Sequence, residues 1–169
     1  MNWKIDNTHS EITFKVKHMM ISTVTGYFEN FDATINTNDE SFENASVEFN
    51  AKIDSINTKN KDRDTHLKSD DFFNSEKFPE MKFISKSFNG QQLIGDLTIK
   101  DVTKTVQLDV DFNGIAVDPY GQTKAGFEIS GNINRKDYNL TWNAVTEAGN
   151  IVVSDKVKIV IDAQFIKQA

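Results

Sequence analysis

The chain has 169 residues, 38% of them hydrophobic, which suits a single domain spanning residues 1–169 around one core. It contains no cysteine, so disulfides and thiolate metal sites are excluded. The formal net charge of −6 disfavours nucleic acid as a partner, because an acidic chain repels phosphate backbones and anionic lipid headgroups.

Features of membrane and exported proteins are not visible in the sequence. No run of 18 or more apolar residues predicts a transmembrane helix, so we expect no stable membrane insertion. The first ten residues, MNWKIDNTHS, do not combine a basic segment with an apolar one, as a signal peptide would. We therefore expect a cytoplasmic protein, with a periplasmic or secreted location only if a leader had been trimmed.

Alternation of apolar and polar residues dominates the chain and predicts antiparallel strands with one face in water. The first such run has Ile12, Phe14 and Val16 on its apolar face. Counting this run, the alternating segments are 12–16, 31–35, 47–53, a weaker one at 81–88, 93–99, 106–112, 127–133 and 157–165.

The first strand ends at an unusual connection. His18, Met19, Met20 and Ile21 follow it, although a connection at this point should face water. We expect Met19, Met20 and Ile21 to form a soft lid or wall at the end of a barrel, with His18 as a polar group at its rim. The alternative is that they plug the barrel end as part of the core.

Short turns join most of the later runs. Residues 100–104 (KDVTK) predict a hairpin between two alternating segments, and residues 118–122 (DPYGQ) predict a turn. About eight strands with one apolar face each can pair as a sandwich or close as a barrel, and closure also removes exposed edges.

Residues 57–81 lack the period of two. Asn60 is a candidate cap for a short helix over residues 61–69, after which Phe72 and Phe73 return to the core. Pro79 ends this excursion and precedes the next strand.

Candidate catalytic and metal-binding residues are few. Three histidines, His9, His18 and His66, could form a zinc site only if the chain bent sharply, so we expect no metal. Asp62 and His66 have the spacing of a helical pair that could orient a general base, but no nucleophile motif accompanies them. Arg135 and Asp137 could bind a carboxylate or phosphate group, or tie a strand end. We expect no catalytic residues and no cofactor.

Several motifs in order along the chain resemble the YceI-like family. They are WKIDNTHSEITFKVKH near the start, RDTHLKSDDFFNSEKFPEMKF in the middle, then GDLTIKDVTKTVQLDVDF and AGFEISGNINRKDYN. The resemblance implies an all-β fold: a single antiparallel eight-stranded lipocalin-like β-barrel with a short helical excursion near residues 60–73. It also implies a binding protein rather than an enzyme, an apolar lumen holding an isoprenoid or other lipid, and a homodimer as an option.

The chain departs from the family pattern at two places. Asn139 stands where the family usually has glycine, and asparagine tolerates positive φ better than most residues. His18, Met19 and Met20 replace a His-Leu-Gly segment, which puts larger side chains at that connection.

The predicted function is therefore the binding of a long apolar ligand in the lumen for carriage, storage or sequestration. The ligand would be a polyisoprenoid, an isoprenoid quinone-like compound or a fatty-acyl compound. The alternatives are a hydrolase or isomerase acting on a lipid-like substrate, through His66 with Asp62 or through the Arg135 cluster, and a solid barrel that serves as an interaction module. The polar rim candidates are His18 and Arg135. The predicted ligand-binding residues are Phe14, Val16, Met19, Met20, Ile21, Phe28, Phe49, Phe73, Phe83, Leu97, Phe112, Phe127 and Ile161.

Overall fold

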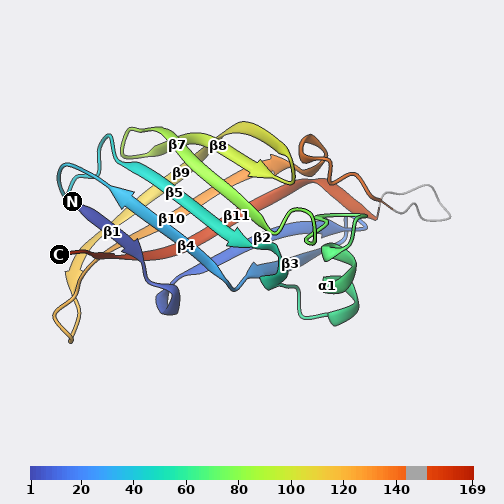
Figure 1. The fold of residues 1–169 in the computed structure, drawn as a ribbon, viewed down its shortest axis with the longest axis horizontal. Coiled ribbons are helices and arrows are strands. Elements are labelled where there is room, and N and C mark those ends of the chain that lie inside the picture. Colours follow the sequence, from blue (N-terminus) through green and yellow to red (C-terminus); the bar gives the residue numbers. More distant parts are fainter. Residues whose placement is uncertain (144–151) are drawn as a thin grey trace.

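The alternating segments form one antiparallel sheet that closes on itself, seen in Figure 1 as an elongated set of tilted strands. The computed structural model describes residues 1–143 and 152–169. The strands are β1 (Asn2–Ile5), β2 (Glu11–His18), β3 (Ser22–Phe28), β4 (Phe31–Asn36), β5 (Ser46–Lys52), β6 (Ile56–Asn57), β7 (Glu80–Phe88), β8 (Gln92–Ile99), β9 (Val102–Val117), β10 (Thr123–Asn134) and β11 (Val153–Lys167). The helices are α1 (Lys61–Lys68) and three 3-10 turns, η1 (Asn7–His9), η2 (Ile53–Ser55) and η3 (Arg135–Tyr138).

Eight strands make the closed ring. Neighbouring strands pair in the order β1, β4, β5, β7, β8, β9, β10, β11, and β11 pairs back to β1. The closing pair is antiparallel, with Trp3 opposite Lys167 and Ile5 opposite Phe165. The predicted fold class, an antiparallel eight-stranded barrel with a short helical excursion, is confirmed.

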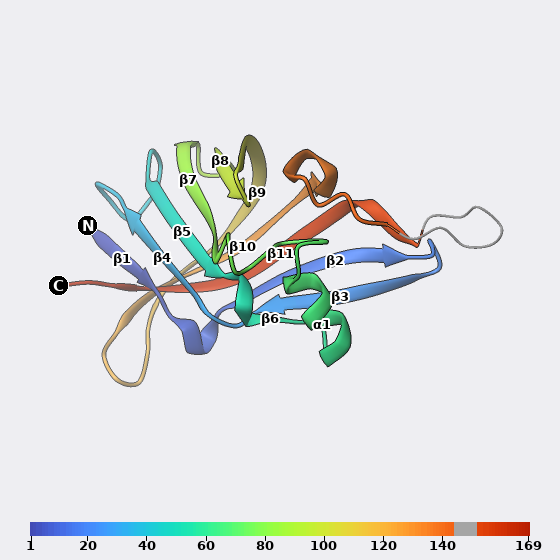
Figure 2. The same ribbon diagram turned by 45° about the vertical axis from the view of Figure 1, so that its right-hand side comes forward.

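The wall of the barrel is interrupted near its start. β1 and β2 both pair with β11, so they are successive parts of one strand that is broken at η1. β3 and β4 follow each other in the same way along β2 and β1. As a result the β2–β3 hairpin leaves the ring at one end, where its partners among the described strands are β11 and the short β6 (Figure 2).

The helical excursion lies at the same end of the barrel (Figures 1 and 2). The Asn60 side chain accepts a hydrogen bond from the Arg63 amide, which confirms the predicted cap. Arg63 also donates to the Thr58 hydroxyl at 2.8 Å and to the Thr58 carbonyl at 2.7 Å, so it ties the helix to the strand before it. No helix among the described residues has the length and apolar character needed to cross a membrane.

The predicted turns are confirmed. Ile99 lies opposite Val102 in the β8–β9 hairpin, and Lys100 has a φ of 59°. In the β9–β10 turn the Asp118 side chain accepts hydrogen bonds from the amides of Tyr120 and Gln122, each at 2.9 Å. These local bonds set the register of the long strand pairs that cross the barrel.

Asp6 fixes the break between β1 and β2. Its carboxylate lies 2.8 Å from the Lys124 ammonium and 2.8 Å from His9 Nδ1, and it accepts a hydrogen bond from the Thr8 amide at 3.1 Å. Burial alone raises the pKa of Asp6, but the hydrogen bonds from Lys124, His9 and Thr8 outweigh it and lower the pKa from 3.8 to about 2.

This shift predicts an acid dependence of stability. Because the folded-state pKa is depressed, the contribution of Asp6 is present above pH 3.8 and is lost as the pH falls through about 2. Replacement of Asp6 by asparagine should cost about 1 to 2 kcal/mol of unfolding free energy at pH 7 and flatten the decline in stability over that range. Urea unfolding at a series of pH values measures both effects. Asp101→Asn, in an exposed turn, is the control and should leave the acid profile unchanged.

Candidate functional site

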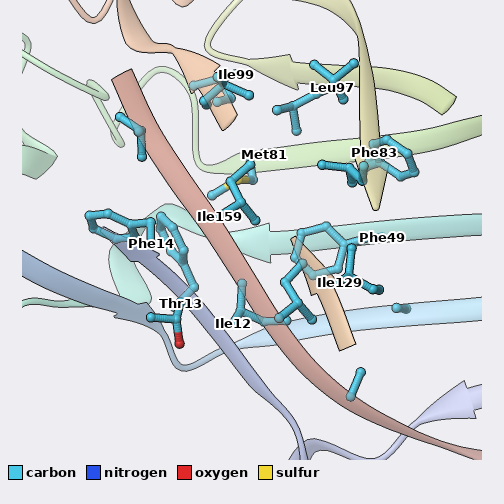
Figure 3. A pocket seen from close by; sticks show the side chains of 18 of the residues that line it. Ile12, Thr13, Phe14, Phe49, Met81, Phe83, Leu97, Ile99, Ile129 and Ile159 are labelled. Atoms are coloured by element: carbon cyan, nitrogen blue, oxygen red, sulfur yellow. The ribbon is translucent and has the colours of Figure 1, made fainter. Parts of the chain in front are cut away.

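An apolar cavity runs inside the ring and is the candidate binding site. Its volume is about 180 Å³, somewhat larger than an engineered cavity of about 150 Å³ that stays dry and binds benzene. Figure 3 shows side chains from several strands around it, including the rings of Phe14, Phe49 and Phe83. Only Thr13 and Arg135 are polar among its lining residues. The others are Ile5, Ile12, Phe14, Val16, Phe28, Ala33, Val47, Phe49, Leu67, Phe72, Phe73, Met81, Phe83, Leu93, Leu97, Ile99, Val106, Leu108, Ile129, Ile133, Leu140, Val157, Ile159, Ile161, Ala163 and Phe165.

One end of the barrel is sealed by aromatic rings. The ring centroid of Phe42 lies 5.1 Å from that of Trp3 and 5.1 Å from that of Phe127. Trp3 and Phe42 are almost completely buried. A second cavity of about 30 Å³ lies against Phe42 and Phe127 and shares four lining residues with the main one, Val47, Leu93, Ile129 and Phe165. The second cavity therefore extends the first toward the sealed end.

The opposite end is the mouth. Lining residues there come from the β2–β3 hairpin, α1 and the start of β11, and they include Val16, Leu67 and Val157. All three keep part of their surface exposed, whereas Trp3 at the sealed end has none. A ligand would therefore enter beside α1 and the β2–β3 hairpin.

Most of the predicted ligand-binding residues meet at this cavity. Phe14, Val16, Phe28, Phe49, Phe73, Phe83, Leu97 and Ile161 line it, and Phe127 lines the smaller extension. Their gathering in one wall places them where a ligand would lie; a role for each in binding stays a prediction.

Phe112 does not line either cavity, which corrects the expectation for it. Its side chain is 39% exposed and stacks on Phe127 with ring centroids 5.1 Å apart. A register shift between Gly126 and Phe127 interrupts the pairing of β9 with β10 at this point. Every residue of β9 from 111 to 117 is exposed, so this part of the strand has left the packed wall and alternation alone placed Phe112 too deep.

Met19, Met20 and Ile21 also lie outside the cavity, contrary to the expected lid or wall. β2 continues through His18, and the chain turns only at the far tip of the β2–β3 hairpin, where the Ile21 amide donates to the His18 carbonyl at 3.1 Å. The three side chains are 40%, 67% and 82% exposed, and His18 is exposed beside them. The hairpin carries them away from the mouth because it leaves the ring before it turns (Figure 2).

Arg135 is a structural anchor rather than a polar group at the rim. Its side chain is only 4% exposed, and its guanidinium donates to the backbone carbonyls of Leu140, Trp142, Val153 and Ser154. Burial lowers the pKa of this guanidinium, and the Asp155 carboxylate at 3.8 Å opposes that effect. Arg135 therefore ties the segment after η3 to the start of β11.

The turn after Arg135 supports this anchor. Asn139 has a φ of 59° at the C-cap of η3, as the substitution of asparagine for glycine predicts.

Asp62 and His66, considered above as a candidate pair for a general base, are not the pair that the structure shows. His66 Nε2 lies 2.9 Å from a carboxylate oxygen of Asp71 instead, and the imidazole packs edge-on against Trp142 and Phe72 at 4.7 and 5.2 Å. The pair forms because the chain after α1 folds back over the helix. Across residues 1–143 and 152–169, no group of three or more His, Asp or Glu side chains is placed to hold a metal ion.

Several residues that line the cavity were not predicted from the sequence. Ile129 and Ile159 stand in alternating runs and were available from that signal, whereas Leu67 and Leu140 lie in segments without a period of two. These last two reach the mouth through α1 and the segment after η3. Only the folded path of those segments reveals them.

Gly26 leaves room for the Phe14 ring in the cavity wall. A Cβ atom at this position would lie 2.1 Å from Cζ of Phe14, its partner across the β2–β3 pair. The absence of a side chain on Gly26 thus lets the Phe14 ring lie against the strand backbone, outside the space that a ligand would use.

Gly26→Ala should push the Phe14 ring into the cavity and lower affinity for a fluorescent fatty-acyl probe several-fold, with a stability loss of about 1 kcal/mol. Combining it with Phe14→Leu should recover most of the affinity, because the shorter side chain clears the new methyl group. Gly126→Ala is the control, since its nearest contact would be an ordinary 3.6 Å. Unchanged affinity in Gly26→Ala would contradict this role for the glycine.

Comparison with known proteins places this geometry among similar barrels. A model of the YceI-like domain matches residues 3–165. A UPF0312 protein of Staphylococcus epidermidis is 39% identical over 164 residues, which cover 96% of each chain. The crystal structure of Burkholderia cenocepacia BcnA superposes with a TM-score of 0.80 at 20% identity, over 95% of this chain and 98% of that one. A polyisoprenoid-binding domain from Saccharophagus degradans superposes with a TM-score of 0.75 at 14% identity, over 98% of both chains.

Proposed function

Because the chain belongs to the YceI-like domain family, we propose that its cavity binds a long apolar molecule for carriage, storage or sequestration. The observation that carries the proposal is the continuous apolar wall inside a closed barrel, with one sealed end and one mouth. The candidates are a polyisoprenoid, an isoprenoid quinone-like compound or a fatty-acyl compound. The description of the Saccharophagus degradans neighbour as polyisoprenoid-binding supports the first of these.

The energetics suit such a ligand. Each buried methylene contributes about 0.8 kcal/mol, so about ten buried carbons contribute about 8 kcal/mol before the entropy losses of association. A wall that is almost entirely apolar distinguishes ligands mainly by length and width. We therefore expect tight but only modestly selective binding.

An enzymatic role has weaker support in the geometry. A hydrolase or isomerase would need a polar reactive group at the ligand, but the Arg135 guanidinium is directed at backbone carbonyls and His66 is paired with Asp71. We propose a binding protein without a cofactor. A homodimer and a cytoplasmic location stay predictions, which light scattering and cell fractionation test.

The direct test is solvent extraction of the purified protein followed by mass spectrometry. We expect a long apolar compound at near-stoichiometric yield, released chemically unchanged. Protein that yields no such compound and does not bind added polyprenol, quinone or fatty-acyl probes would refute the proposal. Conversion of a bound compound that stops in His66→Ala would establish the enzymatic alternative.

A further inference from the structure

The tip of the β2–β3 hairpin exposes three apolar side chains in succession. Met19, Met20 and Ile21, here called the apolar tip, are 40%, 67% and 82% exposed. Met19 and Met20 have φ values of 53° and 59°, so the turn holds two large residues in a conformation that favours glycine or asparagine. Figure 2 shows the hairpin projecting past α1 at the mouth end of the barrel.

Four lysines lie on the strand segments that lead to the apolar tip. Lys15, Lys17, Lys156 and Lys158, here called the lysine group, lie on the outer face of β2 and β11, since the residues between them line the cavity. Lys15 stands directly opposite Lys158, an arrangement of like charges that is unfavourable in the isolated protein. In the described part of the chain no member of the group has a carboxylate within ion-pair distance, whereas the nearby Lys136 reaches Asp155 at 3.3 Å.

The same outer face is acidic farther from the tip. Asp111 lies opposite Glu128, Glu128 opposite Asp162, and Asp162 opposite Glu11, which makes a row of four exposed carboxylates across β9, β10, β11 and β2. Positive charge is therefore gathered at the tip end of a chain whose net charge is −6. An anionic surface would attract that end and repel the rest of the face.

We propose that the apolar tip and the lysine group form a docking surface for an anionic lipid membrane. The apolar tip enters the headgroup region while the lysines contact lipid phosphates, a pairing of two weak signals that gives reversible binding. The contact turns the mouth of the cavity toward the bilayer, because mouth and hairpin share one end of the barrel. The inference does not depend on what the cavity holds, since vesicle binding can be measured without any ligand.

Cosedimentation with vesicles tests the apolar tip. The full chain should bind mixed phosphatidylcholine–phosphatidylglycerol vesicles and bind phosphatidylcholine vesicles far more weakly. The double variant Met20→Asn with Ile21→Thr replaces two exposed apolar side chains by polar ones, and asparagine tolerates the positive φ at position 20. It should lower the affinity for the mixed vesicles about ten-fold or more. The matched control is Val117→Thr with Tyr120→Asn, which removes side chains of 66% and 91% exposure at the opposite end and should change nothing.

A second pair of variants tests the lysine group. Lys15→Gln with Lys158→Gln should lower affinity about 25-fold, at about five-fold for each lysine near an anionic surface. Lys4→Gln with Lys104→Gln makes the same change in net charge elsewhere and should have little effect.

Three outcomes would overturn the proposal. One is that the wild-type chain does not bind the mixed vesicles. Another is that the test variants and their controls lose affinity equally. The third is a dimer that becomes monomeric in the tip variant, because a second copy would then cover the tip.

Discussion

Replacement of Ile159 by glutamate is expected to lower the affinity for a long apolar ligand by about 100-fold or more. Ile159 projects into the cavity from β11, near Phe14 on β2, and it keeps enough exposure for a carboxylate to remain hydrated in the empty protein (Figure 3). A bound chain would remove that water, and leaving a charged group without a partner costs several kcal/mol. Titration with a fluorescent fatty-acyl probe measures the loss.

The control for this charge lies one residue away. Val160 lies between Ile159 and Ile161, which both line the cavity, and it is itself not a lining residue, so Val160→Glu adds the same charge on the outer face of the strand, opposite Ser130. It should leave probe affinity within about two-fold, and both variants should give the same circular dichroism spectrum. Equal affinity in the two variants would show that the ligand does not occupy this cavity.

Removal of the Arg135 guanidinium is expected to have the largest effect on stability. Arg135→Met keeps the apolar stem but leaves carbonyls of Leu140, Trp142 and Ser154 without their donor; the last two bonds are each 2.9 Å long. Unpaired buried acceptors cost about 1 to 3 kcal/mol each, so we expect a loss of about 3 to 5 kcal/mol in unfolding free energy. Urea unfolding measures it.

Two further variants test whether the loss of stability is specific to the Arg135 guanidinium. Lys136→Met changes the next residue, which is exposed and, among the described residues, forms an ion pair with Asp155 alone, and it should cost less than about 1 kcal/mol. Arg135→Lys keeps the charge but lacks the planar fork that reaches several carbonyls at once, so it should recover little of the loss. If Arg135→Met were no less stable than Lys136→Met, the anchoring role would be wrong.

The features predicted correctly from the sequence depend on short stretches of chain. Asn60 as a helix cap, Asn139 in a left-handed turn and the hairpin at Lys100 each follow from a few neighbouring residues. Alternation gave the inward orientation of Phe83 and Leu97 by the same local argument. These local predictions are correct because tertiary packing at these positions favours the same conformation as the local sequence does.

The errors concern features that depend on the whole barrel. Alternation cannot reveal that β2 and β3 extend beyond the closed ring. Met20 was therefore expected in the cavity wall, whereas it lies at the end of the hairpin outside the ring. The four carbonyl acceptors of Arg135 come from two segments that only the fold brings together. Helical spacing offered Asp62 as a candidate partner of His66, whereas the chain after α1 brings Asp71 to it.

The position of the closing strand affects how the protein is made. β11 pairs with β10, β2 and β1, and it is the last of the strands along the chain. During synthesis, at about 5 to 20 residues per second, the strand edges of β2 and β10 stay unpaired until β11 has emerged from the ribosome. Nascent chains that stall before β11 should therefore be captured by chaperones, and chains released with β11 complete should not.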